Sequence, residues 1–160
     1  MNSHIETERK FLVRDDSFKA GASGKSHFVQ GYISSSQGRT VRVRIAGDKA
    51  YLTIKGPGSA NGMSRFEWET EIKAGDALAL LGLSEGALIE KDRWFVPFEG
   101  HLFEVDVFDG DNEGLVVAEV ELDSEDEEFC RPEWLGEEVT GDHRYYNSSL
   151  RNHPYIRWKR

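Results

Sequence analysis

Residues 5–13 read Ile-Glu-Thr-Glu-Arg-Lys-Phe-Leu-Val, and charged side chains recur in this stretch with a period of two. Glu6, Glu8 and Lys10 occupy alternate positions, so in an extended strand they share one face, while Phe11 lies on the other. A helix would scatter these three charges around its surface. The stretch therefore predicts a β-strand with one charged face.

The same period of two continues along the chain, in residues 40–46, 51–55, 65–72, 102–108 and 115–122. The breaks between these stretches are rich in Gly, Pro, Asn, Asp and Ser, which favour turns. Short connections of this kind favour antiparallel hairpins over crossover units. Three further stretches are predicted to be helical, namely 74–81, 124–129 and 144–151.

These elements predict a mainly β (α+β) fold, a closed eight-stranded antiparallel β-barrel with a few short flanking helices. Closure is expected because it removes the exposed edges of a sheet. The chain has 160 residues, of which 38% are hydrophobic, and this length suits a single domain over residues 1–160.

Composition limits the function classes. With 29 acidic residues against 20 Lys and Arg, the net charge of -9 argues against binding to nucleic acid or to an anionic membrane surface. No apolar run is long enough for a transmembrane helix, and the charged start lacks the hydrophobic stretch of a signal peptide. Cys130 is the single cysteine. A protein of the reducing cytoplasm is therefore expected.

Charges of one sign repeat along single strands, as in Arg42 with Arg44 and Glu119 with Glu121. The plain explanation is that each charged face points to water. However, like charges one pleat apart repel each other, which favours a counter-charge or a ligand between the strands. If the charged faces converge inside the barrel, the acids form a cluster suited to Mg²⁺, Mn²⁺ or Ca²⁺. The neighbouring cations would then suit a string of phosphates.

The segment Glu6-Thr7-Glu8-Arg9-Lys10 resembles the Glu-x-Glu-x-Lys signature that opens the CYTH superfamily, the triphosphate tunnel metalloenzymes. Later motifs resemble other parts of that family in the same order: Gln30-Gly31-Tyr32-Ile33, Arg42-x-Arg44, Leu52-Thr53-x-Lys55, residues 66–71, Lys91-x-Arg93, Glu104-x-Asp106, Glu119-x-Glu121 and residues 144–147. The resemblance covers nearly the whole chain and is nearest to the short bacterial members.

The resemblance implies a barrel with a polar interior, a tunnel that holds a triphosphate together with a divalent metal ion. The expected activity is metal-dependent hydrolysis of inorganic tripolyphosphate to pyrophosphate and phosphate. Alternatives are a class IV-type adenylyl cyclase that makes cyclic AMP from ATP, a thiamine triphosphatase, or a non-catalytic polyphosphate- or nucleotide-binding module. The cyclase branch typically has a His-Phe pair before its first signature, whereas here His4 stands alone.

Roles follow from the resemblance together with the charge pattern. The candidate metal ligands are Glu6, Glu8, Asp106, Glu119 and Glu121, with Mg²⁺ or Mn²⁺ as the expected ion and Ca²⁺ as an activator or an inhibitor. The candidate substrate-binding residues are Lys10, Arg42, Arg44, Lys55, Lys91 and Arg93. Glu67, Glu69 and Glu71 are expected to orient these cations through salt bridges, with binding of a second metal ion as the alternative. Arg65 is expected to pair with Glu67 or Glu104, with a place among the phosphate-binding cations as the alternative.

Water is the expected nucleophile, because no Ser-His or Cys-His arrangement offers a covalent route. Lys55, with Arg42, Arg44 and Lys10 around it, is expected to have a lowered pKa and to act as general base. Tyr32 is expected to share that proton through a hydrogen bond. A metal-activated water beside a ligand glutamate is the alternative. The expected partner is a small polyanion (tripolyphosphate, ATP or thiamine triphosphate), and a homodimer through an outer barrel face is a further expectation.

Overall fold

The computed structural model describes residues 4–36 and 38–158. Nine strands form one sheet: β1 (Ile5–Val13), β2 (Gly24–Ser36), β3 (Arg39–Ala46), β4 (Lys49–Gly58), β5 (Ser64–Ile72), β6 (Glu85–Phe98), β7 (His101–Phe108), β8 (Val116–Leu122) and β9 (Leu135–Glu138). Two α-helices, α1 (Ala74–Leu81) and α2 (Asn147–Leu150), accompany 3₁₀ turns at Asp16–Gly21, Gly110–Asn112, His143–Tyr145 and Tyr155–Arg157.

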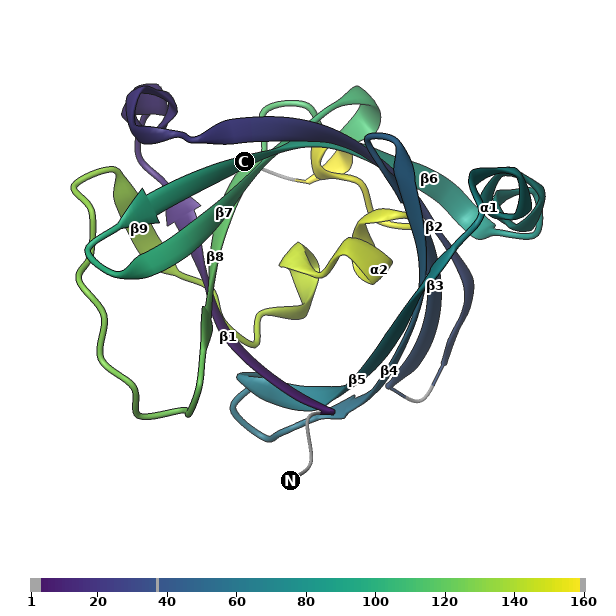
Figure 1. The fold of residues 1–160 in the computed structure, drawn as a ribbon, viewed down its shortest axis with the longest axis horizontal. Coiled ribbons are helices and arrows are strands. Elements are labelled where there is room, and N and C mark those ends of the chain that lie inside the picture. The colour runs from purple at the N-terminus through teal and green to yellow at the C-terminus, as the bar shows by residue number, and fades with distance from the viewer. Residues whose placement is uncertain (1–3, 37, 159–160) are drawn as a thin grey trace.

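Eight of these strands close into the ring seen in Figure 1, in the order β1-β5-β4-β3-β2-β6-β7-β8. The closing seam joins β1 to β5, with Ile5 opposite Phe66 and Thr7 opposite Ser64. Farther along β1 the same edge pairs with β9, where Phe11 lies opposite Glu138. Every pairing in the ring is antiparallel, so the predicted eight-stranded barrel is confirmed.

The main apolar core lies outside the barrel wall. Phe11, Phe103 and Val120 are fully buried there, together with Phe18 of the turn Asp16–Gly21 and Trp134, which precedes β9. On another part of the wall α1 packs against β3 and β4: its Ala77 and Leu81 join Val43 and Ala50 in a separate apolar cluster. Because the strands bury their apolar faces outward, their polar faces are left to line the interior.

The C-terminal segment closes one end of the barrel. In Figure 1 α2 lies within the ring of strands. Leu150 of α2 is 1% exposed and packs with Ile89, Phe108 and Val117, which come from three different strands. Each of these three residues lies an even number of positions from the inward-facing charges of its own strand, so its side chain also points into the barrel. An apolar plug therefore fills this end of the interior.

The helix predictions have different outcomes. Residues 74–81 form α1 as predicted. Residues 124–129 form no helix, because Glu127 does not act as a helix cap: its carboxylate accepts from the backbone N–H of Asp123 and lies beside His101. Residues 144–151 give only a 3₁₀ turn and the short α2, separated by Tyr146 in an extended conformation. Within the described residues no helix is long and apolar enough to cross a membrane.

Candidate active site

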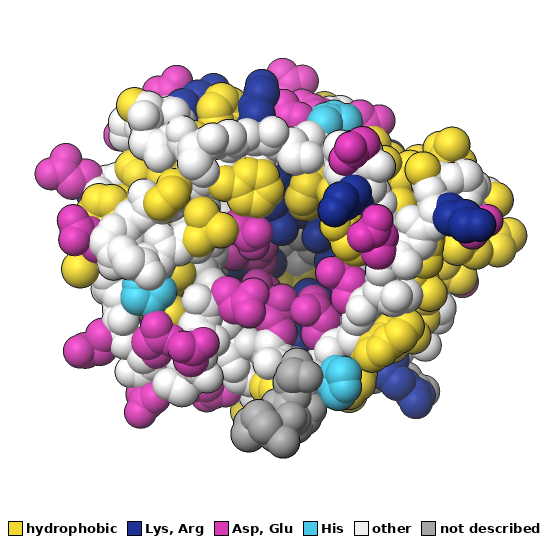
Figure 2. Space-filling view, viewed as in Figure 1, with side chains coloured by type: hydrophobic (Ala, Val, Ile, Leu, Met, Phe, Trp, Pro, Cys, Tyr) yellow, Lys and Arg dark blue, Asp and Glu magenta, His cyan; other side chains and the backbone are white. Residues whose placement is uncertain are grey.

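The interior of the barrel holds a cavity of about 320 Å³. Figure 2 looks into it, with carboxylates around the opening and Lys and Arg side chains deeper inside. Its lining includes seven cations and seven carboxylates: Lys10, Arg42, Arg44, Lys55, Arg65, Lys91 and Arg93, and Glu6, Glu8, Glu67, Glu69, Glu104, Glu119 and Glu121. The prediction that the charged rows face one another across an enclosed interior is confirmed.

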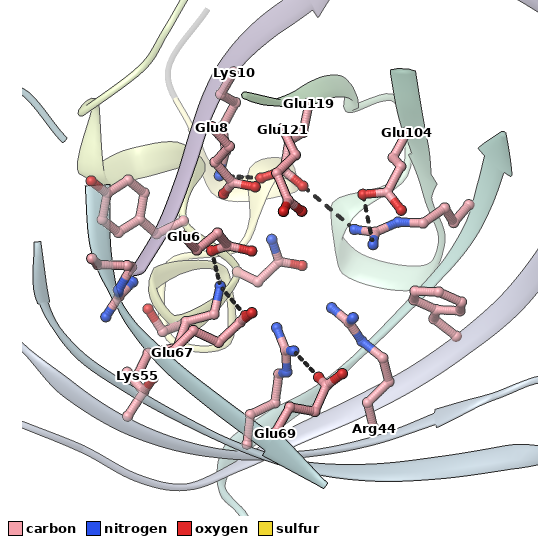
Figure 3. A pocket seen from close by; sticks show the side chains of 18 of the residues that line it. Glu6, Glu8, Lys10, Arg44, Lys55, Glu67, Glu69, Glu104, Glu119 and Glu121 are labelled. Carbon is pink, nitrogen blue, oxygen red and sulfur yellow. Dashed lines mark hydrogen bonds and ion pairs between the residues drawn. The ribbon is translucent and has the colours of Figure 1, made fainter. Parts of the chain in front are cut away.

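Four of the carboxylates come from two neighbouring strands, β1 and β8. The register places Glu8 opposite Glu121 and Glu119 opposite Lys10, so the two acidic pairs lie side by side (Figure 3). Burial raises the pKa of Glu8 well above its ordinary value, and repulsion from Glu119 and Glu6 raises it further. Burial and repulsion from Glu6 likewise raise the pKa of Glu121. Glu8 and Glu121 are therefore short of positive charge, as expected beside a cation site. Burial alone would raise the pKa of Glu119, but Lys10, Arg93 and Lys91 hold it below its ordinary value.

Cations from two other strands, β3 and β6, form a cluster that we call the cationic floor: Arg42, Arg44, Lys91 and Arg93. Burial, Arg42 and Arg93 lower the pKa of Arg44. Burial lowers the pKa of Lys91 to about 7 despite the attraction of Asp106, and repulsion from Arg93 and Arg44 acts in the same direction as burial. The Nε atom of Arg42 is buried and has no hydrogen-bond partner among the described residues. The cationic floor therefore has unmet capacity for an anion.

A family model described as the CYTH domain matches residues 4–151. The chain belongs to the CYTH family. A protein of Acetivibrio thermocellus named inorganic triphosphatase is 48% identical to it over 155 residues, which cover 96% of this chain and 97% of that protein. A protein of Nitrosomonas europaea with the same name is 39% identical over 149 residues, covering 91% of this chain and 95% of that protein.

A solved structure described as an inorganic triphosphatase superposes on this CYTH chain with a TM-score of 0.64 and 35% identity. The match covers 91% of this chain and 97% of the solved one. The chain thus spans nearly the full length of these relatives, and its barrel is the CYTH barrel.

Glu6, Glu8, Glu119 and Glu121 suit the metal-ligand set expected of a CYTH protein, because they line one cavity from two neighbouring strands. The raised pKa values of Glu8 and Glu121 mark these two as short of positive charge. Asp106 does not fit that set. Its side chain is buried, and its oxygens accept hydrogen bonds from Lys91 Nζ at 2.7 Å and from Arg93 Nε and Nη2 at 2.8 and 2.9 Å. Both oxygens are thus engaged by cations, and we assign Asp106 to the support of the cationic floor instead.

Lys55 differs from the sequence-based expectation. Burial alone would lower its pKa, but attraction to Glu6, Glu8 and Glu67 outweighs it, so the pKa of Lys55 is raised above its ordinary value. Its Nζ lies 3.1 Å from Glu6 Oε1 and 3.4 Å from Glu67 Oε2 (Figure 3). The expected cationic neighbours are therefore outnumbered by acids that the sequence could not place beside it.

Tyr32 lines the cavity, as does Lys55. Its hydroxyl accepts a hydrogen bond from Gln30 Nε2 at 3.4 Å, and no hydrogen bond joins Tyr32 to Lys55 in the described part of the chain. The expected sharing of a proton between these two side chains is thus not seen. The two side chains line the same cavity from different strands, Tyr32 from β2 and Lys55 from β4.

The acids of β5 orient basic residues. Glu69 accepts a 2.7 Å hydrogen bond from Thr53 and lies 3.5 Å from Arg42, while Glu67 pairs with Lys55. Glu71, for which the same role was expected, is exposed and is not among the residues that line the cavity.

Arg65 pairs with neither Glu67 nor Glu104. It donates to the backbone carbonyl oxygens of Gly56 and Gly38, and so ties β5 to the turns beside it. That expectation was wrong, because the register brings the Arg65 guanidinium to backbone acceptors.

Sequence reasoning gave no role to several polar residues of this CYTH site. Gln30 and Thr53 are both fully buried among the charges. Asn147, from the C-terminal segment, accepts hydrogen bonds from Gln30 and Lys91. All three residues lie within stretches that resemble family motifs. However, an uncharged amide or hydroxyl has no charge pattern that marks it, so its place in the network depends on the fold.

Proposed function

We propose that this chain is an inorganic triphosphatase that hydrolyses tripolyphosphate to pyrophosphate and phosphate inside its barrel. The observation that carries the proposal is the division of one enclosed cavity into a carboxylate cluster and a cationic floor. The first suits a divalent cation and the second suits phosphate oxygens. Two relatives that share 48% and 39% identity with nearly the whole chain are named inorganic triphosphatases, which supports the same activity here.

In this proposal the cationic floor holds the substrate. The guanidinium groups of Arg42, Arg44 and Arg93 present paired N–H donors to phosphate oxygens, whereas Lys91 supplies a compact charge. Lys10 lies 3.5 Å from Glu119 and extends the positive surface towards the carboxylates. During the reaction these cations stabilise the negative charge that develops on the leaving pyrophosphate.

The charge balance of the cavity supports the use of a divalent ion. The lining carries as many carboxylates as cations, so it cannot by itself neutralise the several negative charges of a tripolyphosphate. Mg²⁺ or Mn²⁺ held by Glu6, Glu8, Glu119 and Glu121 would supply the missing positive charge. Ca²⁺ suits the same oxygen ligands and is expected either to activate or to compete.

The nucleophile in the proposal is water. It attacks a terminal phosphorus, the bond to the bridging oxygen breaks, and pyrophosphate leaves while the water proton passes to a base. Lys55 is our candidate for that base, with Tyr32 as a second side chain in the same cavity. Lys55 is first a cation held by Glu6 and Glu67, so its two possible roles have to be separated by experiment.

Substitution of Lys55 separates the two roles. If Lys55 is the base, Lys55→Arg and Lys55→Ala both lower kcat strongly, by about 100-fold or more, because arginine keeps the charge but cannot accept a proton. If Lys55 acts only as a cation, Lys55→Arg retains most of kcat and the assignment as base is overturned. The measurement is phosphate release at saturating tripolyphosphate.

The activity itself is tested by a phosphate-release panel. Tripolyphosphate, thiamine triphosphate, ATP and pyrophosphate are each assayed with Mg²⁺, Mn²⁺ or Ca²⁺, with Glu8→Gln as the inactive control. We expect tripolyphosphate to be hydrolysed most efficiently. Cyclic AMP from ATP would instead support a cyclase, and tight binding without phosphate release under any ion would support a binding module.

Two expectations about the surroundings of the protein complete the proposal. We infer that it acts in the cytoplasm on a free, small polyanion, in keeping with its acidic composition and its single cysteine. A homodimer is also proposed, and sedimentation at micromolar concentration distinguishes it from a monomer. Cell fractionation with an antibody against the protein tests the compartment.

A further inference from the structure

The C-terminal plug carries a polar side chain to the bottom of the cavity. Asn147 is the first residue of α2 and is among the residues that line the cavity. It is held there because Leu150, in the same helix, is anchored among Ile89, Phe108 and Val117. Tyr145, just before α2, is also buried, and its carbonyl oxygen accepts a hydrogen bond from Lys10 Nζ at 3.3 Å.

Hydrogen bonds fix the orientation of the Asn147 amide. Arg44 Nε can only donate, and its 2.8 Å bond identifies the acceptor as Gln30 Oε1. Gln30 Nε2 therefore faces Asn147 Oδ1, at 3.1 Å. Lys91 Nζ, which also can only donate, reaches the same Oδ1 at 2.9 Å. In the part of the chain that the structure describes, no residue accepts a hydrogen bond from Asn147 Nδ2.

Asn147 thus connects two cations that lie on different strands. Lys91 is on β6 and Arg44 is on β3, with Gln30 of β2 between them. Lys91 and Gln30 are both 0% exposed. If either side chain lost a hydrogen-bond partner, replacing that partner with water would therefore be costly. The other partner of the Lys91 ammonium is Asp106, which Arg93 shares.

We propose that Asn147 is a positioning residue, which holds Lys91 directly and Arg44 through Gln30 at the spacing that receives one phosphate group at the closed end of the cavity. This inference rests on the proposed function, because it assigns a role within the same substrate site. Asn147 acts through the two cations, so its loss weakens substrate binding more than it slows the chemical step.

The test compares Asn147→Ala with Ser149→Ala, a matched control on the same helix whose side chain is not among those that line the cavity. Removing the acceptor from a buried ammonium is expected to raise the KM for tripolyphosphate by about tenfold or more, with a smaller change in kcat. Ser149→Ala is expected to keep the wild-type KM. A KM within about twofold of wild type for a folded Asn147→Ala overturns the proposal.

A double-mutant cycle separates positioning from a general effect on folding. If Asn147 acts through Lys91, the effects of Asn147→Ala and Lys91→Met on substrate binding are less than multiplicative when combined. Fully multiplicative effects overturn the proposal. If Asn147→Ala does not fold, Gln30→Met breaks the same chain of hydrogen bonds with little change in volume and is expected to raise KM likewise. An unchanged KM in Gln30→Met then overturns the proposal.

Calorimetric binding of tripolyphosphate distinguishes failure of this inference from failure of the proposed function. If wild type binds tripolyphosphate but releases no phosphate, the proposed activity fails, and the dissociation constants of the same variants still test Asn147. If wild type is active and the variants bind as tightly as wild type, only the inference about Asn147 fails.

Discussion

At the scale of single residues, Asp106 shows how a buried carboxylate organises the site. Burial by itself would raise its pKa, but Arg93 and Lys91 hold the pKa of Asp106 below its ordinary value. The carboxylate therefore stays charged and compensates two cations in the wall of the cavity. Asp106 thus stabilises the fold, and it affects substrate binding only by holding Lys91 and Arg93 in position.

Replacing Asp106 tests this role. Asp106→Asn leaves two buried cations without their counter-charge, and we expect the free energy of unfolding to fall by about 3–5 kcal/mol. Urea denaturation is the measurement, with Asp111→Asn on an exposed turn as the matched control, expected to stay within about 0.5 kcal/mol of wild type. A loss for Asp106→Asn no larger than that of the control would contradict the assignment.

A second prediction at this scale concerns pH. A hydrogen bond with Asp92 raises the pKa of His27 above its ordinary value, with a smaller contribution from Glu90. The protonated ring is therefore favoured in the folded state, so its contribution to stability is present below the unfolded-state pKa and is lost as pH rises through the folded-state pKa.

We accordingly expect His27→Gln to destabilise the protein at about pH 5.5 and to be neutral at about pH 9. The difference should be under about 1 kcal/mol, because the pair is half-exposed and water screens it. Thermal unfolding of both proteins at the two pH values measures it. An equal destabilisation at both pH values would show that the charge on His27 is irrelevant.

At the scale of elements, the short helix α2 both closes one end of the barrel with an apolar side chain and places a polar side chain in the cavity. A four-residue helix has little stability of its own and depends on tertiary contacts. Leu150 provides them at the closed end of the barrel. The placement of Asn147 is therefore a consequence of apolar burial at the other end of the same turn.

Leu150→Ala is expected to lower the free energy of unfolding by about 2–5 kcal/mol, since a fully buried side chain leaves a cavity among Ile89, Phe108 and Val117. Leu78→Ala on α1, where the side chain is 65% exposed, is the control and should change stability by less than about 0.5 kcal/mol. Guanidinium denaturation provides both values. If the two substitutions had equal effects, α2 would not be the anchor described above.

At the scale of the whole molecule, the chain has a large negative net charge, whereas the lining of the cavity is balanced in charge. The chain carries -9 overall, yet the cavity lining balances seven cations with seven carboxylates. The excess negative charge therefore lies outside the cavity, where it does not help to bind a polyanion. Binding has to come from the interior arrangement and from the ion that accompanies the substrate.

We therefore expect Mg²⁺ and tripolyphosphate to stabilise the protein together more than the sum of their separate effects, because each neutralises charge that the other leaves unmatched. The measurement is the midpoint of thermal unfolding with each ligand alone and with both. EDTA should abolish phosphate release, and added Mg²⁺ should restore it. Strictly additive shifts in the midpoint would contradict coupled binding.

The sequence determined the strands and the faces of those strands. The alternation in residues 5–13 and in the five similar stretches predicts which side chains share a face, because side-chain direction in a strand has a period of two. The ordered motifs then indicate the family, and the repeated like charges indicate an inward polar face. These are local properties of the chain, and each can be read within a few residues.

Only the tertiary structure decided which charges meet. Lys55 lies beside Glu6 because β1 closes the barrel against β5, and Asp106 serves Lys91 and Arg93 because β6 and β7 pair in one register. The position of Asn147 depends on burial of Leu150 more than a hundred residues after the first motif. Packing between distant segments sets the strand register, the closure of the barrel and the position of the C-terminal plug. The pKa of Lys55 and the hydrogen bonds around Asn147 therefore could not be predicted from strand patterns alone.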